Sequence, residues 1–313
     1  MNDSLRRRIR AVEDRVAATY RLPLSEHLLT LRAPAVGVRV LTTGEGAPVV
    51  HINGISAPAL GLAPLIARLP GYRHLLLDLP GHSLAPPYHW QGRTVRELAV
   101  DIVTGTLDAL GVPRAAVVGS SLGGLFALWT ALDAPDRLTR AALVGAPATA
   151  LPGMRAVPEM VSLTTPVRGA LDQRLMQLPA PRFVARYALA GALGTNAAHA
   201  MSDDLLDLHR LPLRLPGQAA SYRALLHRLI RAGSARPENV LTGTELARIT
   251  APTLFVWGDQ DVFAAPETGG ASIAEIPAAR LTVVAGGHNP WFDDAERCAG
   301  PVRAHLTGAR EPA

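Results

Sequence analysis

Short apolar runs alternate with longer helical patterns over most of the chain. Seven runs are expected to be strands, in chain order Val36–Thr42, Pro48–Ile52, His74–Asp78, Ala115–Gly119, Ala141–Gly145, Thr253–Trp257 and Arg280–Ala285. The later runs are almost entirely apolar, as in parallel strands that are covered on both faces. Five stretches between them are expected to be helices: Leu60–Leu69, Thr94–Leu110, Leu122–Leu132, Pro266–Ile276 and Ala295–Leu306. This alternation predicts an α/β fold with a doubly wound, mostly parallel sheet.

The alternation is interrupted between about residues 148 and 250. This segment is rich in Leu, Ala, Arg and Pro, and it contains helical patterns over Ala219–Ala232 and Asp203–His209. We therefore expect a core formed by residues 1–147 and 251–313, with a helical insertion at 148–250.

A narrow apolar stripe marks the beginning of the chain. Leu5, Ile9, Val12 and Val16 recur every three or four residues, which predicts a helix over about residues 1–20. A helical arm packed on the body is favoured over a helix lying on a membrane, because the stripe is narrow and acids interrupt the basic face.

Composition narrows the class of protein. The chain has 313 residues, 48% of them hydrophobic, which argues against disorder. No apolar run reaches the roughly 18–20 residues that span a bilayer. No apolar segment follows the basic residues Arg6–Arg10, so a secretory signal is not expected and a cytoplasmic location is the simplest expectation.

The charge is positive, but its pattern does not indicate a polyanionic partner. The net charge is +5 and every basic residue apart from histidine is a scattered arginine, so we expect neither a nucleic acid nor a membrane as partner. The absence of lysine removes Schiff-base chemistry and a Ser–Lys dyad. Cys298 is the single cysteine, which excludes an internal disulfide and a cysteine-rich metal site; it is expected to be a packing residue. No metal or organic cofactor is expected.

The sharpest motif surrounds Ser121. Gly119-Ser120-Ser121-Leu122-Gly123 has the pattern G-x-S-x-G between an expected buried strand and an expected apolar helix. A sharp strand-to-helix turn exposes such a serine oxygen, and the flanking glycines leave room for the turn. We predict that Ser121 is a nucleophile and that the backbone N–H of Leu122 is an oxyanion donor. Ser120 lacks the flanking glycines and is expected to be a polar turn residue.

A serine nucleophile needs a base and a residue that orients the base. The strand Thr253–Trp257 is followed by Gly258-Asp259-Gln260-Asp261, and the last strand is followed by Gly286-Gly287-His288. Both ends lie at the carboxyl edge of the sheet, where open α/β sheets place their sites. His288 is therefore the predicted base. Asp261 is preferred over Asp259 as its partner, because Asp259 lies directly in the tight turn and is suited to brace it.

Together these motifs resemble the α/β-hydrolase superfamily, in the branch with a cap after the sixth strand. The resemblance covers roughly residues 36 to 306 and includes Asp78-Leu79-Pro80-Gly81-His82, which matches the family's Asp-x-x-Gly-His turn. It implies that the insertion 148–250 covers the pocket and sets substrate choice. It also implies that Asp78 and His82 are structural or lie near the edge of the site, without a chemical role, and that acyl transfer is favoured over the dehalogenase and epoxide-hydrolase chemistries that use an aspartate nucleophile.

One segment departs from the family pattern. The family often has His-Gly after its third strand, whereas this chain has His51-Ile52-Asn53-Gly54-Ile55. Gly54 is retained, so the N–H of Ile55 is expected to be the second oxyanion donor, with Asn53 bracing the loop. Asn53, Ser120 and Trp291 are further candidates to line the site.

The expected activity is that of an esterase-like serine hydrolase, which cleaves a carboxylic ester, lactone or similar acyl substrate with a hydrophobic body through an acyl-enzyme. Alternatives that use the same triad are carbon–carbon bond hydrolysis and a non-hydrolytic elimination or cyclisation in secondary metabolism. A ligand receptor with weak turnover is less favoured.

Overall fold

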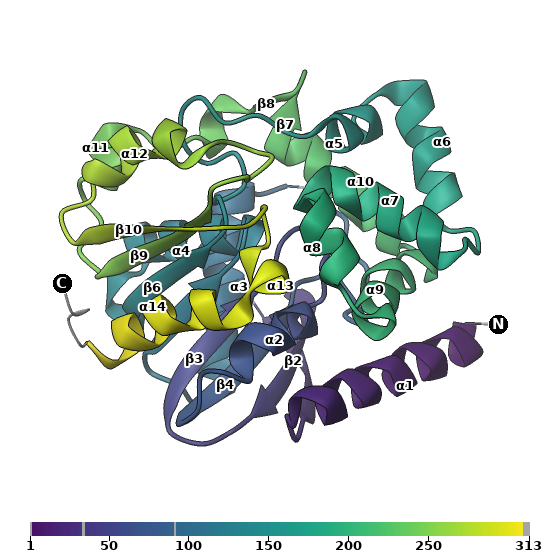
Figure 1. Cartoon of the computed structure of the whole chain (residues 1–313), viewed down its shortest axis with the longest axis horizontal. Coiled ribbons are helices and arrows are strands. Elements are labelled where there is room, and N and C mark those ends of the chain that lie inside the picture. The colour runs from purple at the N-terminus through teal and green to yellow at the C-terminus, as the bar shows by residue number, and fades with distance from the viewer. Residues whose placement is uncertain (1, 33–34, 91, 309–313) are drawn as a thin grey trace.

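The computed structural model describes residues 2–32, 35–90 and 92–308. An eight-stranded sheet forms its centre, with the strand order β1-β2-β4-β3-β5-β6-β9-β10 (Figure 1). Its strands are β1 (Ser25–Arg32), β2 (Ala35–Thr43), β3 (Ala47–Ile52), β4 (Tyr72–Asp78), β5 (Ala115–Gly119), β6 (Leu138–Val144), β9 (Thr253–Gly258) and β10 (Ala279–Val284). β2 pairs antiparallel with both β1 and β4. The other neighbours in this sheet, β4-β3-β5-β6-β9-β10, pair parallel. The prediction of a mostly parallel α/β sheet is confirmed.

Helices cover both faces of the sheet. On each face, a buried apolar cluster lies between the helices and the strands. The core helices are α1 (Asn2–Tyr20), α2 (Ala63–Ile66), α3 (Val95–Ala109), α4 (Leu122–Asp133), α12 (Pro266–Ala274), α13 (Pro290–Asp293) and α14 (Ala295–Thr307). The short helix α11 (Gly243–Leu246) also packs on the core, against α12, although it lies within the segment 148–250 expected as the insertion. α3 and α4 contribute to one cluster, and α1, α2 and α14 contribute to the other. No helix in the described part of the chain is long and apolar enough to cross a bilayer.

The sequence pattern located all the strands of this sheet except β1. In β1 only Leu31 is buried, and Leu28 is two-thirds exposed (66%). β1 is an edge strand that pairs only with β2. A strand with so little burial on either face lacks the apolar run or clear alternation by which strands are recognised in sequence.

A cap of short helices is inserted between β6, the sixth strand, and β9 (Figure 1). It comprises α5 (Pro158–Leu163), α6 (Pro166–Met176), α7 (Arg182–Leu193), α8 (Thr195–Ala200), α9 (Asp203–Arg210), α10 (Gln218–Leu229) and the small hairpin β7 (Ile230–Arg231) and β8 (Ser234–Ala235). The expected helix over Ala219–Ala232 is shorter in the structure, because the chain leaves α10 at Ile230 to form this hairpin.

The turn after β4 anchors the cap. A Cβ at Gly81 would lie 2.5 Å from the Cβ of Ser221, so only a glycine lets α10 approach this closely. The side-chain amide of Gln218 donates to the carbonyl oxygens of Ser83 and Ala85. The Asp-x-x-Gly-His turn is therefore a docking point for the cap, in line with the structural role that the resemblance implied.

A buried arginine joins the N-terminal arm to the sheet. Arg39 on β2 is almost fully buried, and its guanidinium donates to Glu13 of α1 at 2.7 and 2.8 Å, to Asp78 at 2.9 Å and to Glu26 at 2.5 Å. Burial raises the pKa of Glu13 and of Asp78, although Arg39 opposes both shifts. One cation therefore compensates two buried carboxyl groups.

We expect Arg39→Met to lower the free energy of unfolding by about 3–5 kcal/mol, because the two buried carboxylates lose their counter-charge. Urea titration followed by circular dichroism measures the change. Arg10→Met is the matched control: Arg10 also pairs with Glu26, at 2.7 Å, but it is exposed, so its loss is expected to cost about 0–1 kcal/mol. Equal effects of the two substitutions would contradict this account of the arm.

Candidate active site

Ser121 lies in a strained turn between β5 and α4. Its backbone has φ 50° and ψ −115°, in the left-handed half of the map that non-glycine residues avoid. Such strain costs of order 1–3 kcal/mol and persists only where the surroundings impose it. The strand-to-helix turn that the G-x-S-x-G motif predicts is present.

The glycines of the motif are required by close backbone approach. A Cβ at Gly119 would lie 2.3 Å from the carbonyl oxygen of Gly123, and a Cβ at Gly123 would lie 2.0 Å from that of Ile52. Either contact would force the backbone apart. The glycines therefore let α4 begin directly over β3 and β5, which fixes the turn that presents Ser121.

Asp261 and His288, which are 27 residues apart in sequence, meet at the ends of β9 and β10. Nδ1 of His288 lies 3.0 and 2.9 Å from the two carboxylate oxygens of Asp261. The same oxygens accept backbone N–H groups from Phe263 and Ala146, each at 2.9 Å. With the carboxylate held in this way, Nδ1 of His288 is the protonated nitrogen and Nε2 carries the lone pair.

Asp259 has a different position. Its Oδ1 accepts the N–H of Gly286 at 3.0 Å, which ties the turn after β9 to the turn after β10. The structure therefore pairs His288 with Asp261 and gives Asp259 the bracing contact that its place in the tight turn suggested.

The backbone of His288 is held from both the core and the cap. Its N–H donates to the carbonyl of Leu193 at the end of α7, at 3.1 Å. On the other side, a Cβ at Gly145 would lie 2.1 Å from the carbonyl oxygen of His288. A movement of α7 would therefore displace the backbone of His288.

Phe263 connects the Asp261–His288 pair to the serine. Its ring packs on the His288 imidazole, with ring centroids 4.2 Å apart, and it lines the same small cavity as Ser121. Nε2 of His288 is buried and has no hydrogen-bond partner among the described residues, so the Ser121–His288 hydrogen bond is not formed in this structure. Catalytic hydrogen bonds often form only when substrate is bound, and this nitrogen is free to accept a proton.

The loop after β3 packs directly on Ser121. A Cβ at Gly54 would lie 3.3 Å from the Cβ of Ser121. Asn53 braces this loop, because its amide donates to the carbonyl of Pro58 and its oxygen accepts the N–H of Gly54, each at 2.8 Å. Ile55, the next residue, lines the cavity together with Ser121 and Leu122. Leu122 is the first residue of α4, where backbone N–H groups have no partner within the helix.

The cavity beside Ser121 is small and almost entirely apolar. Its lining is Ile55, Ser121, Leu122, Ala148, Thr149, Ala156, Met160, Leu226, Leu229, Ile230 and Phe263. Its volume of about 20 Å³ is room for about one water molecule. Residues of the cap form much of this wall, so a substrate requires the cap to move outward.

Three expected lining residues are not part of this cavity wall. Ser120 is buried behind the turn, and its hydroxyl has no hydrogen-bond partner among the described residues. Asn53 braces the loop from behind. Trp291 on α13 is buried, and its indole N–H donates to the carbonyl of Gly61 at 3.1 Å. The lining residues from the cap could not be recognised in the sequence, because they belong to no motif.

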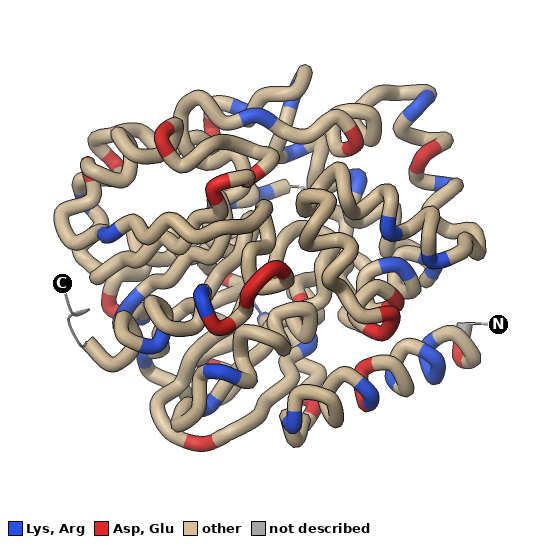
Figure 2. Tube along the Cα trace, viewed as in Figure 1, with Lys and Arg blue, Asp and Glu red and all other residues tan. Residues whose placement is uncertain are grey.

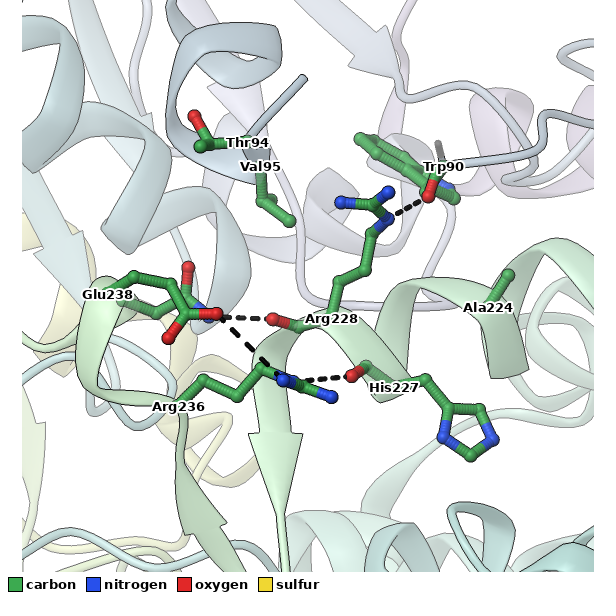
Figure 3. Close-up of a pocket in the computed structure, with 9 residues that line it drawn as sticks. Trp90, Thr94, Val95, Ala224, His227, Arg228, Arg236 and Glu238 are labelled. Atoms are coloured by element: carbon green, nitrogen blue, oxygen red, sulfur yellow. Dashed lines mark hydrogen bonds and ion pairs between the residues drawn. The ribbon is translucent and has the colours of Figure 1, made fainter. Parts of the chain in front are cut away.

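A larger cleft lies on the other side of α10 (Figure 3). It has a volume of about 510 Å³ and is lined by Trp90, Thr94, Val95, Ala224, His227, Arg228, Arg236, Glu238 and Asn239. Leu226 and Leu229 face Ser121, whereas His227 and Arg228 of the same helix face this cleft. Its polar groups largely hold the loops together: Arg228 donates to the carbonyl of Trp90, and Arg236 donates to that of His227. α10 therefore separates this cleft from the cavity that Ser121 lines.

The described residues include no group of three or more His, Cys, Asp or Glu placed to hold a metal ion. Cys298 is buried in α14, and burial raises the pKa of its thiol to about 12. A thiol with this pKa is not a nucleophile at neutral pH, which agrees with the packing role expected for it.

The chain is similar to known proteins of one family. The model of the alpha/beta hydrolase fold family matches residues 48–295. A 2-hydroxy-6-oxononadienedioate/2-hydroxy-6-oxononatrienedioate hydrolase of Cupriavidus pinatubonensis is 32% identical over 77% of this chain and 80% of its own length. A pimeloyl-[acyl-carrier protein] methyl ester esterase of Stenotrophomonas maltophilia is 28% identical, over 87% of this chain and 96% of its own.

Solved structures share the fold at lower identity. Carboxylesterase CesB of Bacillus subtilis has a TM-score of 0.72 at 16% identity, covering 98% of this chain and 100% of its own. The meta-cleavage product hydrolase CumD of Pseudomonas fluorescens has a TM-score of 0.71 at 20% identity, covering 91% and 98%. The protein is a hydrolase that belongs to the alpha/beta hydrolase fold family.

Proposed function

We propose that the protein hydrolyses carboxylic esters with a neutral, apolar acyl group through an acyl-enzyme on Ser121. The observation that carries this proposal is the strained Ser121 turn, which opens into an apolar cavity bordered by Phe263 of the Asp261–His288 pair. Strain of this kind presents a serine oxygen to substrate, and a buried Asp–His pair supplies the base.

The proposed reaction uses five residues of the chain. Nε2 of His288 takes the proton of Ser121 as Oγ attacks the ester carbonyl, and Asp261 stabilises the imidazolium that forms. The N–H groups of Leu122 and Ile55 stabilise the oxyanion. His288 then returns the proton to the departing alcohol, and a water activated by His288 releases the acid from Ser121.

The lining of the cavity supports an uncharged acyl group. None of its residues carries a charge, and a carboxylate buried there without a cation would cost several kcal/mol. The relative from Cupriavidus pinatubonensis is named for dioate substrates, which carry two carboxylates. The lining residues of this chain provide no partner for a second carboxylate.

Carbon–carbon bond hydrolysis is the second candidate. The 32% identity to a hydrolase of a 2-hydroxy-6-oxo acid favours it, and the same serine and histidine would serve it. The two candidates differ in the bond that is cleaved, so product analysis distinguishes them.

A matched pair of esters tests the proposal. p-Nitrophenyl hexanoate and p-nitrophenyl hydrogen adipate have acyl chains of equal length, and only the second ends in a carboxylate. We expect kcat/KM for the adipate ester to be lower by a factor of at least about 10², since its second carboxylate would be buried without a cation. Release of p-nitrophenolate at neutral pH measures both rates.

Two outcomes would count against the proposal. Equal or faster turnover of the adipate ester would show that the site accepts a second carboxylate. Absence of turnover with both esters would reject ester hydrolysis and make the 2-hydroxy-6-oxo acids the substrates to test.

A further inference from the structure

The apolar cavity beside Ser121 contains a second hydroxyl group. Among its lining residues only Ser121 and Thr149 carry a hydroxyl, and the remaining side chains are apolar. Figure 2 shows charged residues along α1 and the cap helices α6, α7 and α9, yet none of them lines the cavity. The polar side-chain groups that this wall offers to a substrate are therefore the nucleophile and the hydroxyl of Thr149.

The hydroxyl of Thr149 is buried without a hydrogen-bond partner. The residue is only 7% exposed, and its side chain makes no hydrogen bond within residues 2–32, 35–90 and 92–308. A buried hydroxyl that stays unpaired is destabilising, whereas a valine would fill the same space without a polar group. A purely hydrocarbon acyl group in this cavity would leave the hydroxyl unpaired, so such a substrate gives no reason for a threonine here.

A strained turn after β6 presents Thr149 to the cavity. Ala148, the residue before it, has φ 50°, a conformation that non-glycine residues avoid. Just before this strained residue, the N–H of Ala146 donates to the carboxylate of Asp261 at 2.9 Å. Backbone strain of this kind is concentrated at active sites and at positions that hold a ligand. The turn therefore fixes the threonine relative to the acid that orients His288.

The turn that carries Thr149 is also held to the core on its C-terminal side. The carbonyl of Ala150 accepts the N–H of Leu241 at 2.8 Å, and both residues are buried in the apolar cluster that α3 and α4 share. The cap helices α5 and α10 supply other parts of the cavity wall. When these helices move outward to admit a substrate, we expect the hydroxyl to keep its place beside Ser121.

A water molecule is the other possible partner for this hydroxyl, since the cavity has room for about one. The acyl chain of a substrate must displace such a water. A hydrocarbon chain cannot replace the hydrogen bond that the water makes, and affinity is lost, whereas an oxygen atom in the chain can replace it. With or without a water in the empty cavity, the hydroxyl of Thr149 therefore favours an acyl chain that contains oxygen.

We propose that Thr149 is a specificity-determining residue, which selects an acyl group with one uncharged oxygen atom in an otherwise apolar chain. The threonine hydroxyl donates to an ether or keto oxygen and accepts from a substrate hydroxyl, so these three groups define the class. The inference rests on the proposed function, in which the cavity beside Ser121 receives the acyl group. It narrows the substrate from neutral acyl groups in general to those that carry such an oxygen.

Oxa analogues of p-nitrophenyl hexanoate test the proposal, because they keep the length of the acyl chain. In these esters an ether oxygen replaces the CH₂ group at position 3, 4 or 5. We expect Thr149→Val to lower kcat/KM for at least one oxa ester by about fivefold or more, relative to its effect on the hexanoate ester, since one neutral hydrogen bond is lost. The ratio of the two effects cancels differences in reactivity and hydration between the esters.

Thr106→Val is the matched control. Thr106 on α3 has a buried hydroxyl that finds no hydrogen-bond partner in the described part of the chain, but it does not line the cavity. We expect this variant to keep the ester preference of the wild type. Equal shifts in preference in the two variants would overturn the proposal, as would a Thr149→Val variant that changes kcat/KM for all the esters alike.

Binding to Ser121→Ala protein separates this proposal from the proposed function. That variant cannot form an acyl-enzyme, so NMR titration measures its Kd for the methyl esters of hexanoate and of the oxa analogues, whichever bond the wild type cleaves. Absence of ester turnover in the wild type would reject ester hydrolysis alone. Selection by Thr149 would still be supported if adding Thr149→Val weakened binding of an oxa ester at least about fivefold more than binding of methyl hexanoate. Equal effects of Thr149→Val on all these Kd values would overturn it.

Discussion

Ser121→Ala is expected to reduce kcat for p-nitrophenyl hexanoate by about 10⁴–10⁶, which is the range found when the nucleophile of a serine hydrolase is removed. The substitution removes the only atom that can form the acyl-enzyme, while the apolar lining and the oxyanion donors are retained. KM is therefore expected to change little. Initial rates with purified protein, together with mass spectrometry of an acyl adduct in the wild type, measure the loss.

Ser120→Ala is the matched control for this experiment. The two serines are neighbours in the same turn, and the hydroxyl of Ser120 is buried without a hydrogen-bond partner among the described residues. Removal of an unpartnered buried hydroxyl is expected to leave activity within about threefold of the wild type. If Ser121→Ala kept full activity, or if Ser120→Ala alone abolished it, the assignment of the nucleophile would be wrong.

The parts of the fold that the sequence could reveal are those with strong periodicity. β5 (Ala115–Gly119) is fully buried between neighbouring strands, so its apolar run gave its bounds correctly. The Ser121 motif sits where local geometry demands glycine, and that demand is visible in sequence because Gly119 and Gly123 have no tolerable substitute. The pairing of Asp261 with His288 could be anticipated because both follow strands that end at the same edge of the sheet.

The sequence pattern does not predict which apolar residues of the cap line the cavity. The cap helices are short, and their apolar residues face three surroundings: the core, the cavity and the solvent. Leu226 and Leu229 line the cavity, whereas Leu171 and Leu175 face solvent, and nothing in the residue type separates these roles. Trp291 illustrates the reverse case: it follows His288 closely in sequence, yet α13 turns its side chain toward Gly61.

The Ser121 turn and the Asp261–His288 pair could be predicted from sequence and the cavity lining could not, and this difference has a physical cause. Catalytic residues are restricted to strand ends and tight turns, where backbone geometry limits the residue types. The cap residues that line the cavity need only be apolar and of suitable size, and many sequences satisfy that condition. Sequence therefore specifies the reaction centre of this chain more closely than its substrate.

Asp261→Asn is expected to lower kcat by about 10⁴ with little change in KM, because the amide favours the histidine tautomer whose proton lies on Nε2. The carboxylate of Asp261 accepts three donors: the N–H groups of Ala146 and Phe263 and Nδ1–H of His288. An amide has only one oxygen, so its NH₂ group would face one of these donors or donate to Nδ1 and place the histidine proton on Nε2. A histidine protonated on Nε2 cannot accept the proton of Ser121.

Asp259→Asn provides the comparison, because its side chain makes one contact that an amide oxygen preserves. Oδ1 of Asp259 accepts the N–H of Gly286, and an asparagine oxygen accepts the same bond. Activity is therefore expected to stay within about tenfold of the wild type, a loss of at most one ordinary hydrogen bond. Initial rates for both variants decide between the two carboxylates. If Asp259→Asn were the more damaging, the orienting acid would be Asp259, and the Asp261–His288 contact would not persist during turnover.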